Sequence, residues 1–146
     1  VNSRGENNVP FGRYKNPTIA DPVKMTASST ALASSILLCG DFSEVEHAAR
    51  ANDFVYLDPP YHPLSETLGF TGYSSGGFSA EDQIRLRDLA LRLTERGVKV
   101  MLSNSNTPFI LKLYSRFNVD RVNAKRTINC KGAKRGAVSE LIIRNY

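Results

Sequence analysis

The stretch that decides the fold is a short apolar run that ends at an acid, two prolines and an aromatic ring: Phe54-Val55-Tyr56-Leu57-Asp58-Pro59-Pro60-Tyr61. Its first four residues are β-branched or large and apolar, with no polar alternation, which predicts a buried strand. Because proline has no backbone N–H to donate, the hydrogen-bonded ladder is expected to end at Asp58.

The residues that follow this strand predict a ligand-binding rim. In an open parallel sheet, ligands bind beyond the carboxyl ends of the strands. Asp58 offers a carboxylate there, the two prolines offer carbonyl oxygens on a stiff backbone, and Tyr61 offers a flat ring. These groups suit a planar ligand with an amine, because the oxygens accept hydrogen bonds from its N–H groups while the ring stacks on it.

The rest of the chain alternates between expected helices and strands. Besides the strand over 54–57, strands are expected over 36–39, 98–102, 119–122 and 140–144. A weak helix is expected over 22–35, and firmer ones over 43–52, from the Ser79 cap to a stop at Gly97, and over 109–117. This alternation predicts an α/β fold that ends with an antiparallel pair of strands.

Two of the expected helices begin with capping signals. Ser43 and Glu46 have the spacing of a capping box. Ser79 precedes Glu81 and Asp82, whose charges favour the first turn of a helix. The helix after Ser79 is expected to bury an apolar stripe made of Ile84, Leu86, Leu89, Ala90 and Leu93.

Composition limits the class of protein. The 146 residues suffice for one domain, and 41% hydrophobic and 23% charged residues are ordinary for a soluble globular chain. No apolar run reaches the roughly 18 residues of a membrane span, and no signal peptide is visible. Cys39 and Cys130 lack metal-ligand spacing and fit reduced cytosolic thiols. A net charge of +5 favours a polyanionic partner.

Two segments combine cations with features of nucleic-acid binding. In the Gly-, Asn- and Pro-rich start of the chain, Arg4, Arg13 and Lys15 alternate with Phe11 and Tyr14. Such a mixture of cations and rings suits contact with phosphates and bases, although a solvated surface loop has the same composition. A basic loop over 126–136 leaves the same two interpretations open.

The chain resembles the DNA adenine methylase (D12 class) family. The resemblance rests on Asp58-Pro59-Pro60-Tyr61 after an apolar strand, and on an upstream segment from Arg4 to Lys15 that is similar to the family's target-recognition hairpin. The Phe70-Thr71-Gly72-Tyr73 loop, the Leu102-Ser103-Asn104 strand end and the Glu140-Leu141 strand follow in the family's order. The resemblance covers nearly the whole chain.

This resemblance implies a fold, a cofactor and a set of sites. The implied fold is the Rossmann-like sheet of methyltransferases that use S-adenosylmethionine, incomplete here because the N-terminal strands are absent. Residues 1–22 would end the target-recognition hairpin, and residues 23–146 would form the C-terminal part of the catalytic domain. The implied catalytic residues are Asp58, Pro59, Pro60 and Tyr61, and the cofactor contacts are Asp41, Phe42 and Asp58. The implied DNA contacts are Asn8, Pro10, Arg13, Tyr14, Lys15, Lys125, Arg126, Lys134 and Arg135.

The expected activity is methyl transfer to the N6 amine of adenine in duplex DNA, with the base flipped out and no metal required. A cytosine-N4 methylase and a non-catalytic DNA-binding fragment remain alternatives. Because the chain starts at Val1 and lacks a G-x-G-x-x-G loop, we expect a fragment that is inactive without an N-terminal half. A bacterial or phage-encoded cytoplasmic enzyme is expected, in a restriction system or alone, and G-A-T-C is the family-based expectation for its target.

Overall fold

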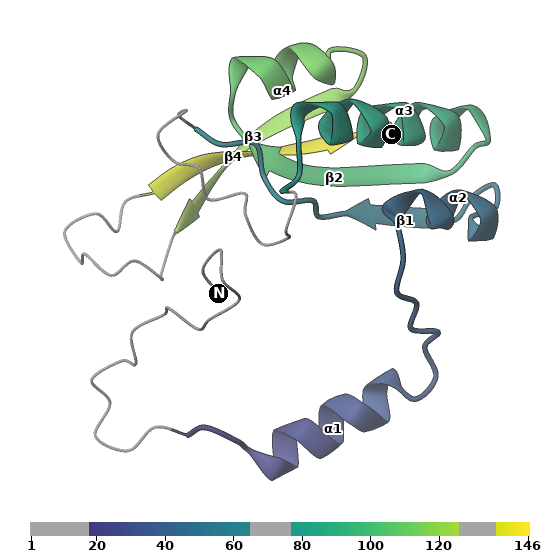
Figure 1. Cartoon of the computed structure of the whole chain (residues 1–146), viewed down its shortest axis with the longest axis vertical. Helices are drawn as coiled ribbons and strands as arrows, with labels where there is room; N and C mark the ends of the chain where they lie inside the picture. The colour runs from purple at the N-terminus through teal and green to yellow at the C-terminus, as the bar shows by residue number, and fades with distance from the viewer. Residues whose placement is uncertain (1–17, 65–76, 126–136) are drawn as a thin grey trace. The chain divides into compact units, whose positions relative to one another are not determined.

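The computed structural model describes residues 18–64, 77–125 and 137–146. The chain divides into two compact units, Val1–Asp41 and Phe42–Tyr146, which are treated separately below. This division reflects how the chain packs. The expected boundary between residues 22 and 23 instead separates two expected roles, DNA recognition and catalysis, and it stays a prediction. Figure 1 labels the elements of both units.

The first unit contains one described helix. Helix α1, Pro22–Leu32, confirms the weak helix expected there, and the Asp21 side chain caps it by accepting a hydrogen bond from the Lys24 N–H. The strand expected over 36–39 is wrong. This segment pairs with no described strand, and Ile36, Leu37 and Leu38 are exposed. Apolar residues favour a strand, but only a neighbouring backbone can satisfy its N–H and C=O groups.

The second unit is built on a four-stranded mixed sheet. Its strands are β1 (Phe54–Leu57), β2 (Lys99–Ser105), β3 (Asn118–Lys125) and β4 (Ala137–Arg144), in the spatial order β1-β2-β4-β3. β1 and β2 are parallel, while β4 runs antiparallel to both β2 and β3. The expected α/β organisation with a terminal antiparallel pair is therefore confirmed.

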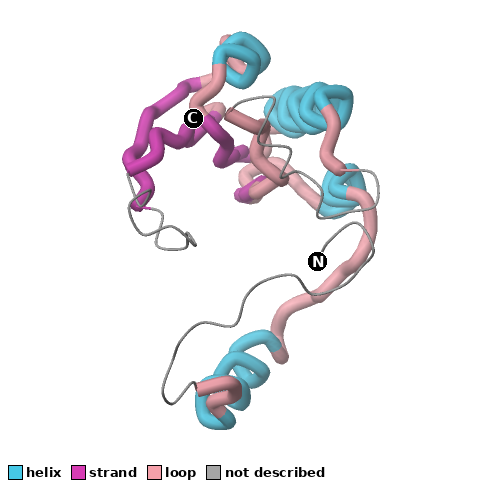
Figure 2. The backbone as a smooth tube through the Cα atoms, turned by 60° about the vertical axis from the view of Figure 1, so that its left-hand side comes forward, coloured by secondary structure: helices cyan, strands magenta, loops and turns pink. Residues whose placement is uncertain are grey.

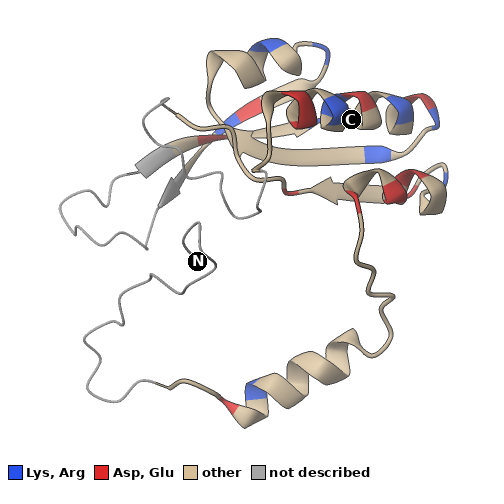
Figure 3. Ribbon diagram, viewed as in Figure 1, with Lys and Arg blue, Asp and Glu red and all other residues tan. Residues whose placement is uncertain are grey.

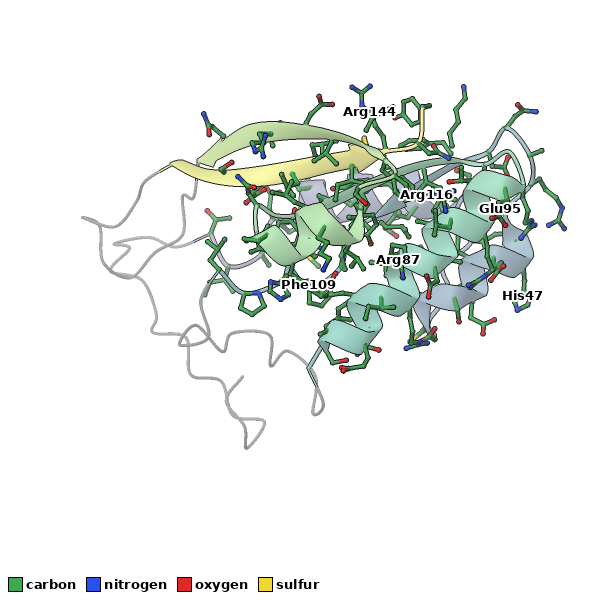
Figure 4. All side chains as sticks on the ribbon, turned by 90° about the horizontal axis from the view of Figure 1, so that it is seen from above. His47, Arg87, Glu95, Phe109, Arg116 and Arg144 are labelled. Atoms are coloured by element: carbon green, nitrogen blue, oxygen red, sulfur yellow. The ribbon has the colours of Figure 1, made fainter. Side chains whose placement is uncertain are left out.

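Helices α3 (Ala80–Glu95) and α4 (Pro108–Leu113) cover one face of this sheet, as Figures 1 and 4 show. The buried core between them and the strands consists of Val55, Leu57, Leu86, Leu89, Leu93, Val100, Leu102, Ile110, Tyr114, Leu141 and Ile143, among others. β1 is only half buried, contrary to expectation. Phe54 and Tyr56 point to the other face and are 54% and 49% exposed.

Helix α3 follows its sequence signals closely. Ser79 and Asp82 form a capping box, and Gly97 follows the last turn with a φ of 75° that favours glycine. Four members of the expected stripe are buried, but Ile84 is 38% exposed. Gln83, which was not expected in this stripe, is buried instead. The ribbon in Figure 3 shows acidic (red) and basic (blue) positions interspersed along α3.

The expected helix over 43–52 is shorter than predicted and starts differently. A 3-10 turn, Phe42–Glu44, leads into α2, Val45–Ala48, whose N-cap is Glu44 without a side-chain cap. The Ser43–Glu46 capping box is therefore wrong. The Glu46 carboxylate instead accepts hydrogen bonds from Arg92 of α3 at 2.8 and 2.9 Å, and this interaction holds the pKa of Glu46 below its usual value. Figure 2 shows α2 beside α3.

The other boundaries differ by a few residues. β2 continues through Ser103, Asn104 and Ser105, which were expected to follow the strand. Helix α4 starts at Pro108, one residue before the expected range of 109–117, and stops at Leu113, and β3 and β4 are each longer than expected. Cys39 is an exposed free thiol, whereas Cys130 and the 126–136 loop lie outside the described residues. None of the described helices has the length and apolarity needed to cross a membrane.

The α3 cap gives a stability prediction. In the complete gene product that contains this chain, Ser79→Ala should lower the free energy of unfolding by about 1 kcal/mol, because the Asp82 N–H loses its acceptor. Urea denaturation followed by circular dichroism measures this change. Ser79→Thr keeps the hydroxyl and serves as the control. Equal stability of the two variants would contradict the assigned cap.

Candidate functional site

The candidate site lies where the two parallel strands end. β1 stops at Leu57, immediately before Asp58, as the prolines predict. Leu57 is level with Leu102 of β2, and β2 then continues for the three residues up to Ser105. The end of β2 therefore runs alongside the segment from Asp58 to His62. Alternate residues of this strand end point to opposite faces of the sheet.

On the face opposite the helices, a chain of hydrogen bonds fixes the Asp58 carboxylate. The Ser103 hydroxyl donates to Asp58 Oδ1 at 2.9 Å. A serine hydroxyl has one proton, so the Tyr56 hydroxyl donates to Ser103 Oγ, also at 2.9 Å. One carboxylate oxygen is thus held in place. Among the described residues none donates to Oδ2, which leaves it able to accept a hydrogen bond from a ligand.

On the helix-covered face, two buried amides hold the backbone around Tyr61. Gln83 Nε2 donates to the Pro60 carbonyl at 2.9 Å, and Asn104 Oδ1 accepts from the His62 N–H at 3.0 Å. Asn104 Nδ2 donates to Gln83 Oε1 at 3.0 Å, which joins the two amides. Gln83 and Asn104 are 1% and 0% exposed. We refer to Gln83 and Asn104 as the amide clamp.

Two further contacts fix the residue after Tyr61. The Ser105 hydroxyl donates to the His62 carbonyl. The His62 ring stacks on Phe109 of α4, with ring centroids 4.7 Å apart and an interplanar angle of 26°; Phe109 is labelled in Figure 4. The segment from Asp58 to His62 is consequently attached to β2, α3 and α4.

The environment of Tyr61 keeps its ring uncharged. Burial raises the pKa of the Tyr61 phenol; the Ser103 hydroxyl acts in the opposite direction, and the Glu140 and Asp58 carboxylates add to the rise. Because the usual pKa of tyrosine is already near 10, the side chain stays neutral at physiological pH. A neutral, partly buried ring is suited to stacking on a planar ligand.

The other expected cofactor residues, Asp41 and Phe42, are consecutive in the chain but belong to different units. Asp41 is exposed and ends the first unit, and Phe42 begins the second. The Phe42 ring packs against Phe78, with centroids 5.8 Å apart, and lies under the Arg85 guanidinium at 4.9 Å. Phe42 and the Pro60 carbonyl therefore both contact the amino-terminal part of α3. This helix brings an expected cofactor residue and the segment from Asp58 to His62 to one region.

Of the expected DNA-binding residues, only Lys125 belongs to the described part of the chain. Asn8, Pro10, Arg13, Tyr14, Lys15, Arg126, Lys134 and Arg135 lie outside the described residues, as does the loop from Phe70 to Tyr73. Lys125 ends β3, and its side chain is not described. Their roles stay predictions. The described part contains no cluster of three or more potential metal ligands.

Sequence reasoning missed several residues of this site: Tyr56, His62, Gln83, Ser103, Asn104 and Ser105. Signals for two of them were present. Gln83 lies three residues before Leu86, which puts a polar side chain in line with the apolar stripe of α3. Asn104 ends an apolar run that forms the strand parallel to β1, and this places its amide near the Asp58 segment.

Comparison with known proteins identifies the family. The model of the D12 class N6 adenine-specific DNA methyltransferases matches residues 1–128. The chain belongs to this family. It is 51% identical over 148 residues to the type II methyltransferase M.MjaIII of Methanocaldococcus jannaschii and covers 51% of that protein. It is 47% identical to the type II methyltransferase M1.LlaDCHI of Lactococcus lactis, of which it covers 52%.

More distant members include the DNA adenine methylase of Escherichia coli K12, which is 37% identical over 143 residues and half covered. A relative from Escherichia phage P1 carries the name DNA N-6-adenine-methyltransferase. The chain spans about half the length of the first relatives that it matches. The resemblance drawn from the Asp58-Pro59-Pro60-Tyr61 segment and its neighbours is thereby confirmed at the level of the family.

The hydrogen-bonded chain at Asp58 gives a second prediction. Tyr56→Phe and Ser103→Ala should each lower the free energy of unfolding by about 1 kcal/mol, and the double variant should lose less than the sum, because both remove the same hydrogen bond. Urea denaturation of the complete gene product and its three variants measures this coupling. Strictly additive losses would contradict the contact.

Proposed function

We propose that this chain carries the catalytic segment of an enzyme that transfers a methyl group from S-adenosylmethionine to the N6 amine of adenine in duplex DNA. One observation carries the proposal: a fixed Asp58 carboxylate next to the Pro59 carbonyl, at the carboxyl end of a parallel strand. No described residue donates a hydrogen bond to that carbonyl. Both oxygens are therefore available to the two N–H groups of an exocyclic amine.

The two acceptors address the main chemical difficulty of this reaction. The adenine amine is a poor nucleophile, because its lone pair is delocalised into the ring. Hydrogen bonds to Asp58 and Pro59 favour a tetrahedral nitrogen, whose lone pair is localised. The same oxygens stabilise the positive charge that develops on nitrogen, and they are held in place before the base arrives.

Tyr61 would hold the ring of the target base. A base inside the duplex cannot reach Asp58, so it must leave the stack, which costs a few kcal/mol. Stacking on an aromatic side chain recovers roughly 1–3 kcal/mol per base. The neutral ring of Tyr61 and its attachment through Pro60 and His62 support this role.

The residues present fit the proposed cofactor. S-adenosylmethionine, when bound, supplies an electrophilic methyl group on a sulfonium. Phe42 presents an aromatic surface that is backed by Phe78 and Arg85, which suits packing against an adenine ring. We assign Asp41 to the amino group of that adenine and Asp58 to the methionine end of the cofactor, following the family resemblance.

We further propose that activity needs the portion of the relatives that this chain does not match. β1 is at the edge of the described sheet, and Phe54 and Tyr56 on it are half exposed. The apolar segment 36–38 is exposed as well. A Rossmann-like sheet completed by additional strands would satisfy the free edge of β1 and cover these residues. In this arrangement residues 1–22 end a DNA-reading hairpin, and residues 23–146 belong to the catalytic domain.

Two other functions remain as alternatives. A cytosine-N4 methylase would use the same acceptors, because cytosine also carries an exocyclic amine. A non-catalytic DNA-binding protein would use only the segment up to residue 22 and the basic loop. The D12 family match favours adenine. Analysis of the methylated base in treated DNA separates the first alternative, and the next experiment separates the second.

Removal of the carboxylate tests the catalytic assignment. In the complete gene product, Asp58→Ala should abolish methyl transfer, while the affinity for DNA changes little, because the amine loses an acceptor and the DNA-contacting segments are intact. Tritium transfer from labelled S-adenosylmethionine and fluorescence anisotropy of labelled DNA measure the two quantities. Asp120→Asn removes another exposed carboxylate, which pairs with Arg144, and serves as the control. Retained transfer in Asp58→Ala would refute the assignment.

The proposed DNA-reading segment gives a separate prediction. Arg13→Ala should weaken DNA binding and lower the slope of log affinity against log salt by about one phosphate contact. Anisotropy titrations at several salt concentrations measure the slope, and Lys24→Ala on α1 is the control for loss of one positive charge. Equal slopes for wild type and Arg13→Ala would remove this arginine from the interface.

A further inference from the structure

We propose that the amide clamp, Gln83 and Asn104, consists of positioning residues that set the orientation of Tyr61 and leave the Pro59 carbonyl free for the target amine. The inference rests on the proposed function and deepens it. Neither residue is proposed to touch the base or the cofactor. Both act through the backbone on either side of Tyr61.

The orientation of both amides follows from the backbone groups that they contact. Asn104 Oδ1 receives the N–H groups of His62 and Ser105, and only an oxygen accepts two such donors. Its Nδ2 group must therefore face Gln83 and donate to Oε1. Gln83 Nε2 is then left facing the Pro60 carbonyl, which can only accept. The hydrogen-bond directions are consistent from β2 to the catalytic segment.

This arrangement restrains Tyr61 from both sides. The Pro60 carbonyl immediately precedes Tyr61 and the His62 N–H immediately follows it. A rotation of the backbone at Tyr61 would break one or both hydrogen bonds and leave buried polar atoms without partners. Such unsatisfied groups are costly, and the clamp is almost completely buried. The ring is therefore held ready for stacking before DNA binds.

The clamp also distinguishes the two proline carbonyls. The Pro60 carbonyl is occupied by Gln83, whereas no described residue donates to the Pro59 carbonyl. If Gln83 released Pro60, the peptide groups of the segment could reorient, and the acceptor beside Asp58 would no longer be defined. A displacement of reacting groups by about 1 Å can lower a rate about 100-fold. The clamp should thus affect the rate of transfer more than the affinity for DNA.

The test replaces Gln83 with methionine, which has a similar shape and neither donates to the Pro60 carbonyl nor replaces the amide oxygen. Thr94→Val is the matched control, because it removes a hydroxyl of α3 that accepts from Asn145, outside the clamp. In the complete gene product, Gln83→Met should lower kcat for adenine methylation roughly 10- to 100-fold, with KM for DNA within about twofold. Thr94→Val should keep both near the wild-type values.

A second measurement does not depend on methyl transfer. With labelled tyrosines, the nuclear magnetic resonance signal of the Tyr61 ring, assigned through Tyr61→Phe, should show increased mobility in Gln83→Met and none in Thr94→Val. An unchanged Tyr61 signal, or equal kinetics of the two variants, overturns the positioning role. A wild-type protein without methyl transfer but with the expected difference in Tyr61 mobility refutes the proposed function and leaves the clamp's effect on Tyr61 supported.

If the Gln83→Met variant does not fold, a measurement on the wild-type protein tests the same proposal. The backbone N–H of His62 should exchange slowly with solvent, because Asn104 Oδ1 accepts its proton inside the protein. The N–H of Ile36, an exposed residue outside the helices and strands, provides a fast-exchanging reference. Exchange of the His62 N–H as fast as that of Ile36 overturns the proposal.

Discussion

The parallel pairing of β1 with β2 is the constraint on which the site depends. Its register places Leu57 level with Leu102, so the prolines stop β1 while β2 continues to Ser105. Beyond Leu102, β2 has no described strand partner on the side of β1. The polar residues at the end of β2 are therefore open to the segment that follows Asp58. A shift of this register by one residue would exchange the faces of Ser103 and Asn104, and neither would then reach its partner.

The two faces of β2 hold different parts of the same segment. Ser103, opposite the helices, fixes the acidic side chain of Asp58, while Asn104, on the helix-covered face, fixes the backbone beyond it. A strand achieves this division because successive side chains point in opposite directions. The carboxylate and the aromatic ring are therefore positioned by independent contacts, although they are only three residues apart.

Helix α3 connects the core with the site. Its apolar residues fill the space above the sheet, and its capping box fixes where the helix begins. Near that start, Gln83 reaches the Pro60 carbonyl and Arg85 lies over the Phe42 ring. Because packing of the apolar stripe determines the rotation of the helix about its axis, the same packing determines where these two polar side chains point.

The sequence by itself determined the family, the end of β1 before the acid, the prolines and the ring, the alternation of helices and strands, and the Ser79 cap. These features depend on local chemistry: the missing N–H groups of proline, apolar periodicity and short-range capping. It wrongly predicted a strand over 36–39 and a capping box at Ser43, because both depend on partners elsewhere in the chain. Glu46 bonds to Arg92 instead of the helix start, and 36–39 has no described neighbour. Only the tertiary structure decided that Gln83 and Asn104 hold the segment around Tyr61, since these residues are 21 positions apart and meet through the packing of α3 on β2.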